Sequence, residues 1–366
     1  MKVLYDHQAF TGMTYGGVTR YFYELMQAYA DRDDIDFELS LQFSNNEYLD
    51  KASFSTHRRY GLAHWRNVSR LASAVNRLYS NQRVRMGDYQ VFHPTYYHNY
   101  FLRNLGNRPL VVTFHDATSE RYGKQYPEVG EHLSAAKKIQ LARADKIIAV
   151  SEFSKQEILR FFPVDEKKID VIHLGTAFSR QRSHVPAVPG AHPYLLYVGK
   201  RGLYKNFEGF FRAIQPVFRQ HANLHLICAG GGSFTHDEKV CFQASGFGQR
   251  IHYRSITDLS LYELYHQAEA FVFPSLNEGF GIPVLEAFSA GCPAILSNRS
   301  SLPEVGADAA VYFDPEQDES IACAVEKVLT DSSLQQSMRQ KGTQRLAHFS
   351  WEKTATKTEN LYRQLS

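Results

Sequence analysis

Two glutamates and several glycines lie close together in residues 271–288, which read FVFPSLNEGFGIPVLEAF. A short run of β-forming residues, Phe271–Phe273, ends at a proline and predicts a strand. A loop with two glycines follows, and Pro283 suits the first turn of a helix that Gly291 ends. A strand, a glycine loop and a helix N-terminus in this order direct several backbone N–H groups at one point. That arrangement is typical of a phosphate-binding site.

The carboxylates of Glu278 and Glu286 frame this phosphate site. A carboxylate repels a phosphate, so we expect both to bind neutral hydroxyls instead. A nucleotide sugar has both kinds of group, because hydroxyls on its sugar and ribose lie on either side of a diphosphate. For either glutamate alone the alternative holds: Glu278 as a loop charge, and Glu286 as a helix-start charge that the helix dipole favours.

The whole string resembles the signature of the retaining glycosyltransferases of family 4, which have the GT-B fold. The matching parts are Glu-Gly-Phe-Gly, Pro-x-x-Glu-Ala with seven residues between the glutamates, and Ala-Gly-Cys-Pro. The resemblance implies an α/β protein with two facing doubly wound Rossmann-like domains and a nucleotide sugar in the cleft between them. The donor would lie mainly on the second domain and the acceptor mainly on the first. Transfer would retain the anomeric configuration and need no cofactor and no metal.

The resemblance also implies roles for single residues. Glu278 would hold the transferred sugar and Glu286 the ribose. Backbone N–H groups of the loop would stabilise the diphosphate, and backbone near the end of an earlier predicted strand, Ile251–Tyr253, would hold the nucleobase. The residues implied for these backbone contacts are Gly279, Phe280, Gly281, Tyr253 and Ile256.

A basic loop, Gly199–Asn206, follows the predicted strand Tyr194–Val198. Cations in a glycine-bounded loop suit a diphosphate, although a solvated basic loop has the same composition. The resemblance assigns Arg201 and Lys205 to the leaving diphosphate, as catalytic groups. The commoner family spacing places Lys200 in the arginine position, so Lys200 and Arg201 both stay candidates.

The first domain offers two further candidates. Gly16 and Gly17 follow the predicted strand Lys2–Tyr5, where glycines let backbone approach a phosphate or simply form a turn. His115 follows the predicted strand Leu110–Thr113, at the sheet edge where α/β proteins bind ligands. A structural or helix-capping histidine is the alternative. The resemblance implies that the glycines face the diphosphate and that His115 contacts the transferred sugar or the acceptor.

Alternating strand and helix patterns predict open parallel sheets that position these residues. We expect an N-terminal domain at residues 1–178, a linker at 179–193, a C-terminal domain at 194–349, and a last helix at 350–366 that crosses back to the first domain. A helix is predicted at Asn206–Gln220 and a loop at Asn298–Glu304. The other predicted strands are Asp36–Leu41, Gln90–Phe92, Lys146–Val150, Ile169–Ile172, Leu224–Ala229, Ile251–Tyr253 and Ala294–Ser297.

Composition narrows the class of protein. The chain has 366 residues, enough for two domains, and its net charge of +3 is too small to indicate nucleic-acid binding. No apolar run approaches the roughly 18 residues that span a bilayer. The early charge at the N-terminus does not suit a signal peptide, so we expect a cytoplasmic protein. The four cysteines show no metal-ligand spacing and are expected in the core.

A basic segment lies between Lys51 and Gly87, where there is no Asp or Glu. Apolar residues alternate with its arginines, so residues 57–85 could lie on an anionic membrane surface. The alternative is a solvated helix with some arginines in internal ion pairs. The arginines are Arg58, Arg59, Arg66, Arg70, Arg77, Arg83 and Arg85.

The stretches His115–Asp116, Val150–Lys155 and Gly199–Asn206 look most like bacterial polysaccharide mannosyltransferases. That resemblance implies hexose transfer, with GDP-mannose as the first donor to test, to a glycan or lipid-linked saccharide in cell-surface polysaccharide (lipopolysaccharide) synthesis. Three alternatives stay open: a sugar-nucleotide epimerase of the same fold, a glycoside hydrolase with two carboxylates, and a non-enzymatic membrane-binding module. A nicotinamide dehydrogenase is disfavoured because the glycines lack its spacing.

Overall fold

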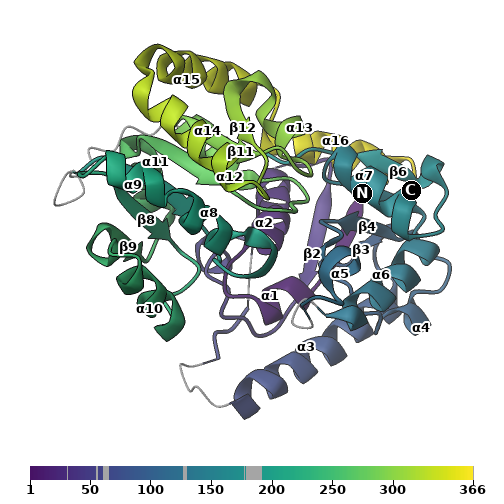
Figure 1. Ribbon diagram of the computed structural model, residues 1–366. Helices are drawn as coiled ribbons and strands as arrows, with labels where there is room; N and C mark the ends of the chain where they lie inside the picture. The colour runs from purple at the N-terminus through teal and green to yellow at the C-terminus, as the bar shows by residue number, and fades with distance from the viewer. Residues whose placement is uncertain are drawn as a thin grey trace. The chain divides into compact units, whose positions relative to one another are not determined.

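The chain forms two compact units in a computed structural model, which describes residues 1–30, 32–54, 57–60, 66–126, 130–176, 178 and 192–365 (Figure 1). The first unit is Met1–Gly175 together with Trp351–Ser366, and the second is Thr176–Ser350. The last helix therefore belongs to the first unit. The predicted linker, 179–193, lies outside the described residues up to position 191.

Parallel strands form the centre of the first unit, in the orders β2-β1-β3 and β4-β5-β6. An isolated parallel bridge between Phe92 and Leu110 joins the two sheets. The central strands are buried on both faces and read as continuous apolar runs, as parallel strands covered by helices do. The strands are β1 (Lys2–Asp6), β2 (Asp36–Ser40), β3 (Val91–His93), β4 (Val111–Phe114), β5 (Lys146–Ala149) and β6 (Ile169–Val171).

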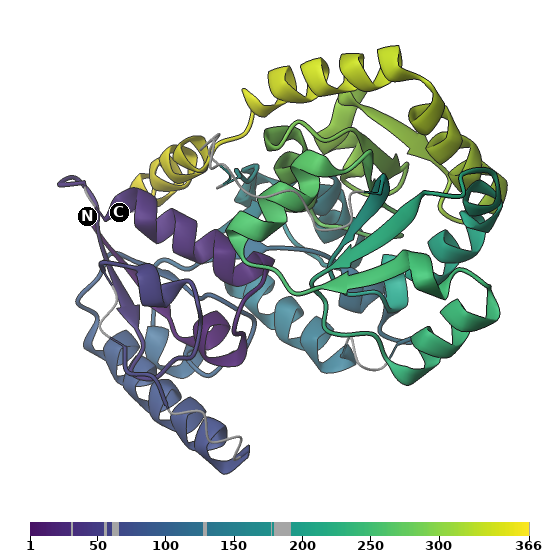
Figure 2. The same ribbon diagram turned by 90° about the vertical axis from the view of Figure 1, so that its left-hand side faces the viewer.

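Helices cover this sheet. α2 (Gly17–Tyr29) buries an apolar stripe at helical spacing, which includes Phe22, Leu25 and Met26. The C-terminal helix α16 (Trp351–Arg363) lies beside α2, as Figures 1 and 2 both show, and the Tyr29 hydroxyl donates to the Ala355 carbonyl at 2.9 Å. The other helices of this unit are α1 (Gln8–Gly12), α3 (Arg66–Met86), α4 (Leu102–Leu105), α5 (Thr118–Tyr122), α6 (Glu131–Arg143) and α7 (Glu152–Phe161), with 3-10 turns at Leu49–Lys51 and Glu166–Lys168.

A buried polar chain also holds α16 to the sheet. The Tyr362 hydroxyl lies 3.0 Å from the Tyr5 hydroxyl and 2.5 Å from His93 Nδ1. The other ring nitrogen of His93 lies 2.9 Å from the Thr113 hydroxyl. Burial lowers the pKa of His93 to about 3, so its imidazole is neutral and can donate at one nitrogen and accept at the other.

The second unit has one sheet of six parallel strands in the order β12-β11-β10-β7-β8-β9. Counted from β7, this is the doubly wound order 6-5-4-1-2-3, in which the direction of winding reverses between β7 and β10. We call this place the second switch point. The strands are β7 (Tyr194–Val198), β8 (His225–Ala229), β9 (Ile251–Arg254), β10 (Ala270–Phe273), β11 (Ala294–Ser297) and β12 (Ala310–Phe313).

The helices of the second unit differ from expectation in two places. The helix predicted at Asn206–Gln220 is two helices with a break at Ile214, because Pro216 has no N–H to continue the hydrogen-bond ladder. The loop predicted at Asn298–Glu304 contains the start of a helix. The helices are α8 (Phe207–Ala213), α9 (Gln215–Gln220), α10 (His236–Ala244), α11 (Asp258–Gln267), α12 (Ile282–Ser289), α13 (Leu302–Gly306), α14 (Asp318–Thr330) and α15 (Ser332–Leu346), with 3-10 turns at Leu203–Lys205, Gly248–Arg250 and Ala307–Ala309.

The prediction for the cysteines is half right. Cys228 and Cys292 are buried, and burial raises the pKa of both thiols. Cys241 and Cys323 are exposed, so their assignment to the core was wrong. Both lie on helices of the second unit, α10 and α14, whose buried residues occupy other positions.

Candidate functional site

The strongest cluster of predicted residues lies at the second switch point, where the loops after β7 and β10 meet. Lys205 Nζ contacts Glu278 Oε1 at 2.6 Å. Beside this pair, the Leu276 amide donates to the Tyr204 carbonyl at 2.8 Å. In doubly wound sheets the carboxyl ends of the strands at the switch point border the ligand crevice. The structure therefore brings together two of the predicted catalytic residues at that crevice.

The Lys205–Glu278 pair is shielded but not sealed from solvent. Their side chains are 21% and 13% exposed. The Lys205 ammonium also lies 5.1 Å from the centre of the Tyr204 ring and 5.6 Å from that of Phe273, within cation–π range. A compact cation and a carboxylate in partly apolar surroundings can each take a ligand group of suitable charge: a phosphate on the ammonium and a hydroxyl on the carboxylate.

Two serines that sequence reasoning missed hold the loop of Glu278. The Glu278 amide donates to the Ser300 hydroxyl at 3.0 Å, and the Ser301 hydroxyl donates to the carbonyls of Glu278 and Phe280 at 3.0 and 2.8 Å. Ser300 has a positive φ of 56°. The available signal was a pair of serines three residues beyond the end of β11, a strand of the same sheet.

The glycine loop turns into α12 as predicted. Gly281 caps the helix with φ of 103°, and a Cβ there would lie 2.9 Å from a methyl group of Leu302. Only glycine suits both constraints. Phe280 is buried against Phe349, with ring centres 5.8 Å apart, so its side chain is not presented to a ligand. Glu286 lies half-buried on α12 and accepts a hydrogen bond from the Tyr265 hydroxyl at 3.2 Å.

Arg201 makes its contacts within the protein. Its side chain is 4% exposed, and its guanidinium donates to both carboxylate oxygens of Glu238 at 2.6 and 3.3 Å. It also donates to three carbonyls, those of Gly230, Gly232 and Ser233, and its carbon lies 4.9 Å from the centre of the Phe234 ring. A phosphate ligand would need these donors. In the structure Arg201 ties the loops after β7 and β8 together, and its predicted contact with the diphosphate stays a prediction.

Lys200, the other candidate for the arginine position, is exposed. Its carbonyl accepts from the Tyr197 hydroxyl at 2.5 Å, which fixes the backbone of the loop. The loop after β8 packs tightly against this backbone, since a Cβ on Gly231 would lie 2.2 Å from the Gly199 carbonyl oxygen. Of the two alternatives, the geometry favours Lys200, because its ammonium is open to a ligand.

The two residues predicted near the nucleobase lie at the same sheet edge. Tyr253 is the last residue but one of β9 and is half-buried, with the centre of its ring 6.1 Å from that of Phe234. Ile256 follows β9, and its terminal methyl lies 3.0 Å from where a Cβ on Gly230 would be. Both side chains therefore support the loop after β8, and the predicted contact through their backbone stays a prediction.

In the first unit, the predicted glycines begin α2. Gly16 is the cap, with φ of 146°, and Gly17 is the first helical residue. The Gly16 carbonyl accepts from the Arg20 amide at 2.9 Å, so the helix is closed at its first turn. A Cβ on either glycine would meet nothing within 4 Å, so the space beside this backbone is open.

His115 follows β4, as predicted. Its ring lies edge-on to Tyr21, with centres 5.4 Å apart, and its amide donates to the Tyr97 hydroxyl at 3.0 Å. Within the described residues, its Nε2 is buried and has no hydrogen-bond partner. Burial lowers the pKa of His115 to about 4, although Asp116 acts to raise it. The imidazole is therefore neutral and suited to bond a neutral hydroxyl.

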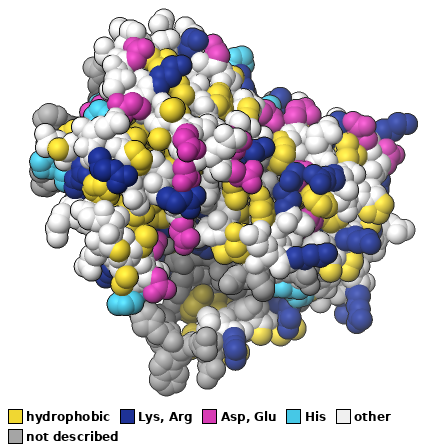
Figure 3. Space-filling model, in the orientation of Figure 1, with side chains coloured by type: hydrophobic (Ala, Val, Ile, Leu, Met, Phe, Trp, Pro, Cys, Tyr) yellow, Lys and Arg dark blue, Asp and Glu magenta, His cyan; other side chains and the backbone are white. Residues whose placement is uncertain are grey.

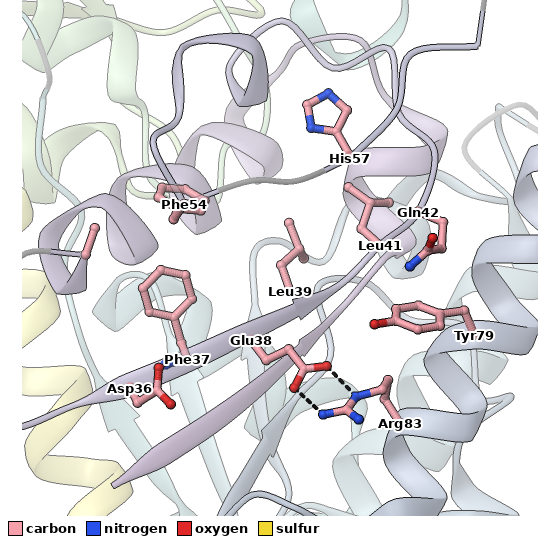
Figure 4. Close-up of a pocket in the computed structure, with 11 residues that line it drawn as sticks. Asp36, Phe37, Glu38, Leu39, Leu41, Gln42, Phe54, His57, Tyr79 and Arg83 are labelled. Carbon is pink, nitrogen blue, oxygen red and sulfur yellow. Dashed lines mark hydrogen bonds and ion pairs between the residues drawn. The ribbon is translucent and has the colours of Figure 1, made fainter.

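A cavity of about 540 Å³ lies elsewhere in the first unit, beside β2 and α3. Figure 4 shows its lining, in which Arg83 pairs with Glu38 below the rings of Phe37 and Phe54. None of the predicted site residues lines it. In the described part of the chain, no group of three or more His, Cys, Asp or Glu side chains is placed to hold a metal ion, and no helix has the length and apolarity to cross a membrane.

Known families match both units. The family described as Glycosyl transferases group 1 matches residues 179–345, and the one described as Glycosyltransferase Family 4 matches residues 15–180. The O-antigen chain mannosyltransferase B of Escherichia coli is 30% identical over 95% of this chain and 96% of its own length. The chain belongs to the group 1 glycosyltransferases.

Solved structures show the fold of this glycosyltransferase. The sucrose-phosphate synthase of Thermosynechococcus elongatus matches 100% of the chain and 98% of its own, with a TM-score of 0.76 at 21% identity. Anabaena Alr3699/HepE, solved in complex with UDP-glucose, covers 99% of both chains with a TM-score of 0.72 at 16% identity. The predicted family and the predicted GT-B fold with two Rossmann-like domains are both confirmed.

Proposed function

We propose that this glycosyltransferase moves a hexose, with mannose from GDP-mannose as the first choice, to a glycan or lipid-linked saccharide in cell-surface polysaccharide synthesis. The observation that carries the proposal is the Lys205–Glu278 pair at 2.6 Å, at the carboxyl edge where the second sheet reverses its winding. The choice of mannose is supported by the Escherichia coli relative, which is named a mannosyltransferase.

Donor binding exchanges the partners within this pair. The diphosphate takes the Lys205 ammonium and the backbone N–H groups at the start of α12, from Gly279 to Gly281, where the positive end of the helix dipole also lies. Glu278, released from the lysine, accepts hydrogen bonds from hydroxyls of the transferred sugar. Lys200 is the second cation for the diphosphate, and Glu286 holds the ribose.

Transfer then breaks the bond between the anomeric carbon and the diphosphate oxygen and forms a bond from that carbon to an acceptor hydroxyl oxygen. The hydroxyl proton goes to the departing phosphate, and the configuration is retained. Negative charge grows on the leaving group, and Lys205 with the loop amides stabilises it without a metal. One well-placed donor of this kind contributes roughly 3–4 kcal/mol.

The first unit contributes on the acceptor side in this proposal. The neutral imidazole of His115, whose Nε2 has no hydrogen-bond partner among the described residues, is suited to a sugar hydroxyl, and the open backbone of Gly16 and Gly17 to the diphosphate. The backbone at Tyr253 and Ile256 holds the nucleobase. A lipid-linked acceptor lies at a membrane surface, so the protein would work there as a peripheral protein.

A thermal-shift screen against GDP, UDP and dTDP with EDTA present tests the donor side. One nucleotide should raise the melting temperature in proportion to the logarithm of its concentration over Kd. Lys205→Ala should abolish that shift, whereas Lys239→Ala, an exposed lysine on α10, should keep it. No shift with any nucleotide would contradict the proposal, and product analysis showing an isomerised donor without transfer would favour an epimerase.

A further inference from the structure

Helix α3 has a buried face and an exposed face of unusual composition. Its buried positions recur every four residues, at Ala72, Asn76, Ser80 and Val84. Asn76 fixes this side, because its side-chain oxygen accepts from the amides of Gln42 and Phe43 at 3.0 and 2.9 Å. The orientation of the helix on the first unit is therefore set, and so are the residues that it presents to solvent.

Three large apolar side chains lie on the exposed face. Leu71 is 66% exposed, Leu78 69% and Met86 58%. At 3.6 residues per turn, positions seven or eight apart lie on one side of a helix. An arginine precedes each of the three. We call this set the α3 stripe: Arg70, Leu71, Arg77, Leu78, Arg85 and Met86.

The arginines of the α3 stripe differ from neighbouring arginines in their ion pairing. Arg59 pairs with Asp50, and Arg83 pairs with Glu38 beside the cavity of Figure 4. Arg70, Arg77 and Arg85 are exposed and have no ion pair within the described residues. Helix α3 has no Asp or Glu along its 21 residues. Internal pairing, the alternative considered for this segment, therefore accounts for Arg59 and Arg83 and leaves the stripe unexplained.

The charge and shape of the α3 stripe select its partner. Exposed leucines flanked by unpaired guanidinium groups are the pattern of a helix that lies in the interface of an anionic bilayer. A helix of this length, roughly 30 Å, lies at the periphery of the first unit in Figure 2. In Figure 3, basic and apolar side chains lie side by side at the lower margin, where Figure 1 places α3.

We infer that the α3 stripe docks the first unit on an anionic lipid surface, with Leu71, Leu78 and Met86 entering the headgroup region and Arg70, Arg77 and Arg85 contacting lipid phosphates. This deepens the proposed function, in which the acceptor is lipid-linked, but docking itself does not depend on glycosyl transfer.

Vesicle co-sedimentation of the full chain tests the inference, with phosphatidylcholine vesicles that contain or lack about 30% phosphatidylglycerol. The full chain should bind the anionic vesicles, and less at high salt. Arg70→Gln/Arg77→Gln/Arg85→Gln should lower the partition coefficient about 100-fold, because each basic residue contributes about a factor of five. The matched control Arg103→Gln/Arg160→Gln/Arg219→Gln removes the same charge from other exposed positions and should retain binding.

The apolar half of the stripe has its own variant. Leu71→Ser/Leu78→Ser should lose vesicle binding, whereas Ile139→Ser/Leu259→Ser, two residues of similar exposure elsewhere, should keep it. Equal loss in the control variants, or equal binding to uncharged vesicles, would overturn the inference. So would a concentration-dependent dimer in ultracentrifugation that only Leu71→Ser/Leu78→Ser dissolves, because a second copy would then cover the stripe.

Transfer to a water-soluble acceptor separates this inference from the proposed function. Stripe variants should show unchanged transfer to such an acceptor and reduced transfer only to acceptor embedded in anionic vesicles. If the unaltered chain binds vesicles but transfers no sugar to any acceptor, the proposed function fails and the docking stands. If it transfers sugar but ignores anionic vesicles, the docking fails alone.

Discussion

The two units differ in the side chains that connect the loops at their switch points. In the second unit, a charged pair spans the loops after β7 and β10, Lys205 to Glu278. In the first unit the order β2-β1-β3 reverses between β1 and β3, and there Gln8 spans the loops. Its side-chain oxygen accepts from the His98 amide at 2.7 Å, and its nitrogen donates to the His98 carbonyl at 3.1 Å.

The nearby carboxylate of the first unit is already occupied. Asp6 accepts from the Thr95 amide at 2.8 Å, the Gln8 side chain at 2.6 Å and the Tyr100 hydroxyl at 3.1 Å. Burial lowers the pKa of His7, which follows it, and so disfavours a charged imidazole there. In the proposed function, the Lys205 ammonium of the second unit therefore takes the charge of the anionic leaving group, and the side chains at the switch point of the first unit suit neutral hydroxyls.

The largest expected effect comes from removing either member of the charged pair in the second unit. Lys205→Ala and Glu278→Gln should each lower kcat for transfer about 100- to 1000-fold, because each removes a group that stabilises the leaving group or positions the sugar. Both side chains are partly exposed, so the melting temperature should change little. Lys239→Ala is the control. Near-normal turnover in either variant would remove that residue from the site.

The next effect concerns stability. Arg201→Ala should lower the free energy of unfolding by about 3 kcal/mol, because Glu238 then loses its partner in a largely buried pair and three carbonyls lose a donor. Burial is the largest single influence on the pKa of Glu238 and acts to raise it, but the hydrogen bond and charge of Arg201 together with hydrogen bonds from Thr235 outweigh it, so the pKa lies below the usual value. Chemical denaturation measures the loss. A double-mutant cycle with Glu238→Gln should show coupling, and a variant of full stability that fails only in transfer would restore Arg201 to the diphosphate.

Arg201 also shows what sequence could and could not predict. The strand, glycine loop and helix at residues 271–288 were readable because apolar runs and Gly and Pro positions are local signals. The partners of an arginine side chain, by contrast, are not determined by the residues next to it in the sequence. Here they are Glu238 and three carbonyls in a loop some 30 residues further along the chain, which no spacing within Gly199–Asn206 could show. The supports from Ser300 and Ser301 were missed for the same reason.

The pH dependence of stability tests whether the histidines of the first unit are neutral. Buried His93 and half-buried His115, whose Nε2 is buried, have pKa values lowered to about 3 and about 4, against roughly 6.5 when unfolded. The unfolded chain therefore binds more protons, and stability present above pH 6.5 is lost as the pH falls toward these values. Each histidine contributes a slope of at most about 1.4 kcal/mol per pH unit. His115→Gln should reduce the slope of unfolding free energy between pH 6.5 and 4 by up to one proton, and an unchanged slope would contradict its buried, neutral state.

The smallest expected effect on the fold is the sharpest test of the glycines in the first unit. Gly17→Ala adds a methyl group where nothing lies within 4 Å and where φ is not positive, so unfolding free energy should stay within about 0.5 kcal/mol of the original. Any loss of transfer then reports a ligand that needs this space. Gly231→Ala is the contrast, because its Cβ would lie 2.2 Å from the Gly199 carbonyl oxygen and the second unit should be destabilised. If Gly17→Ala keeps full turnover and an unchanged KM for the donor, the diphosphate does not approach this backbone, and the second unit binds it alone.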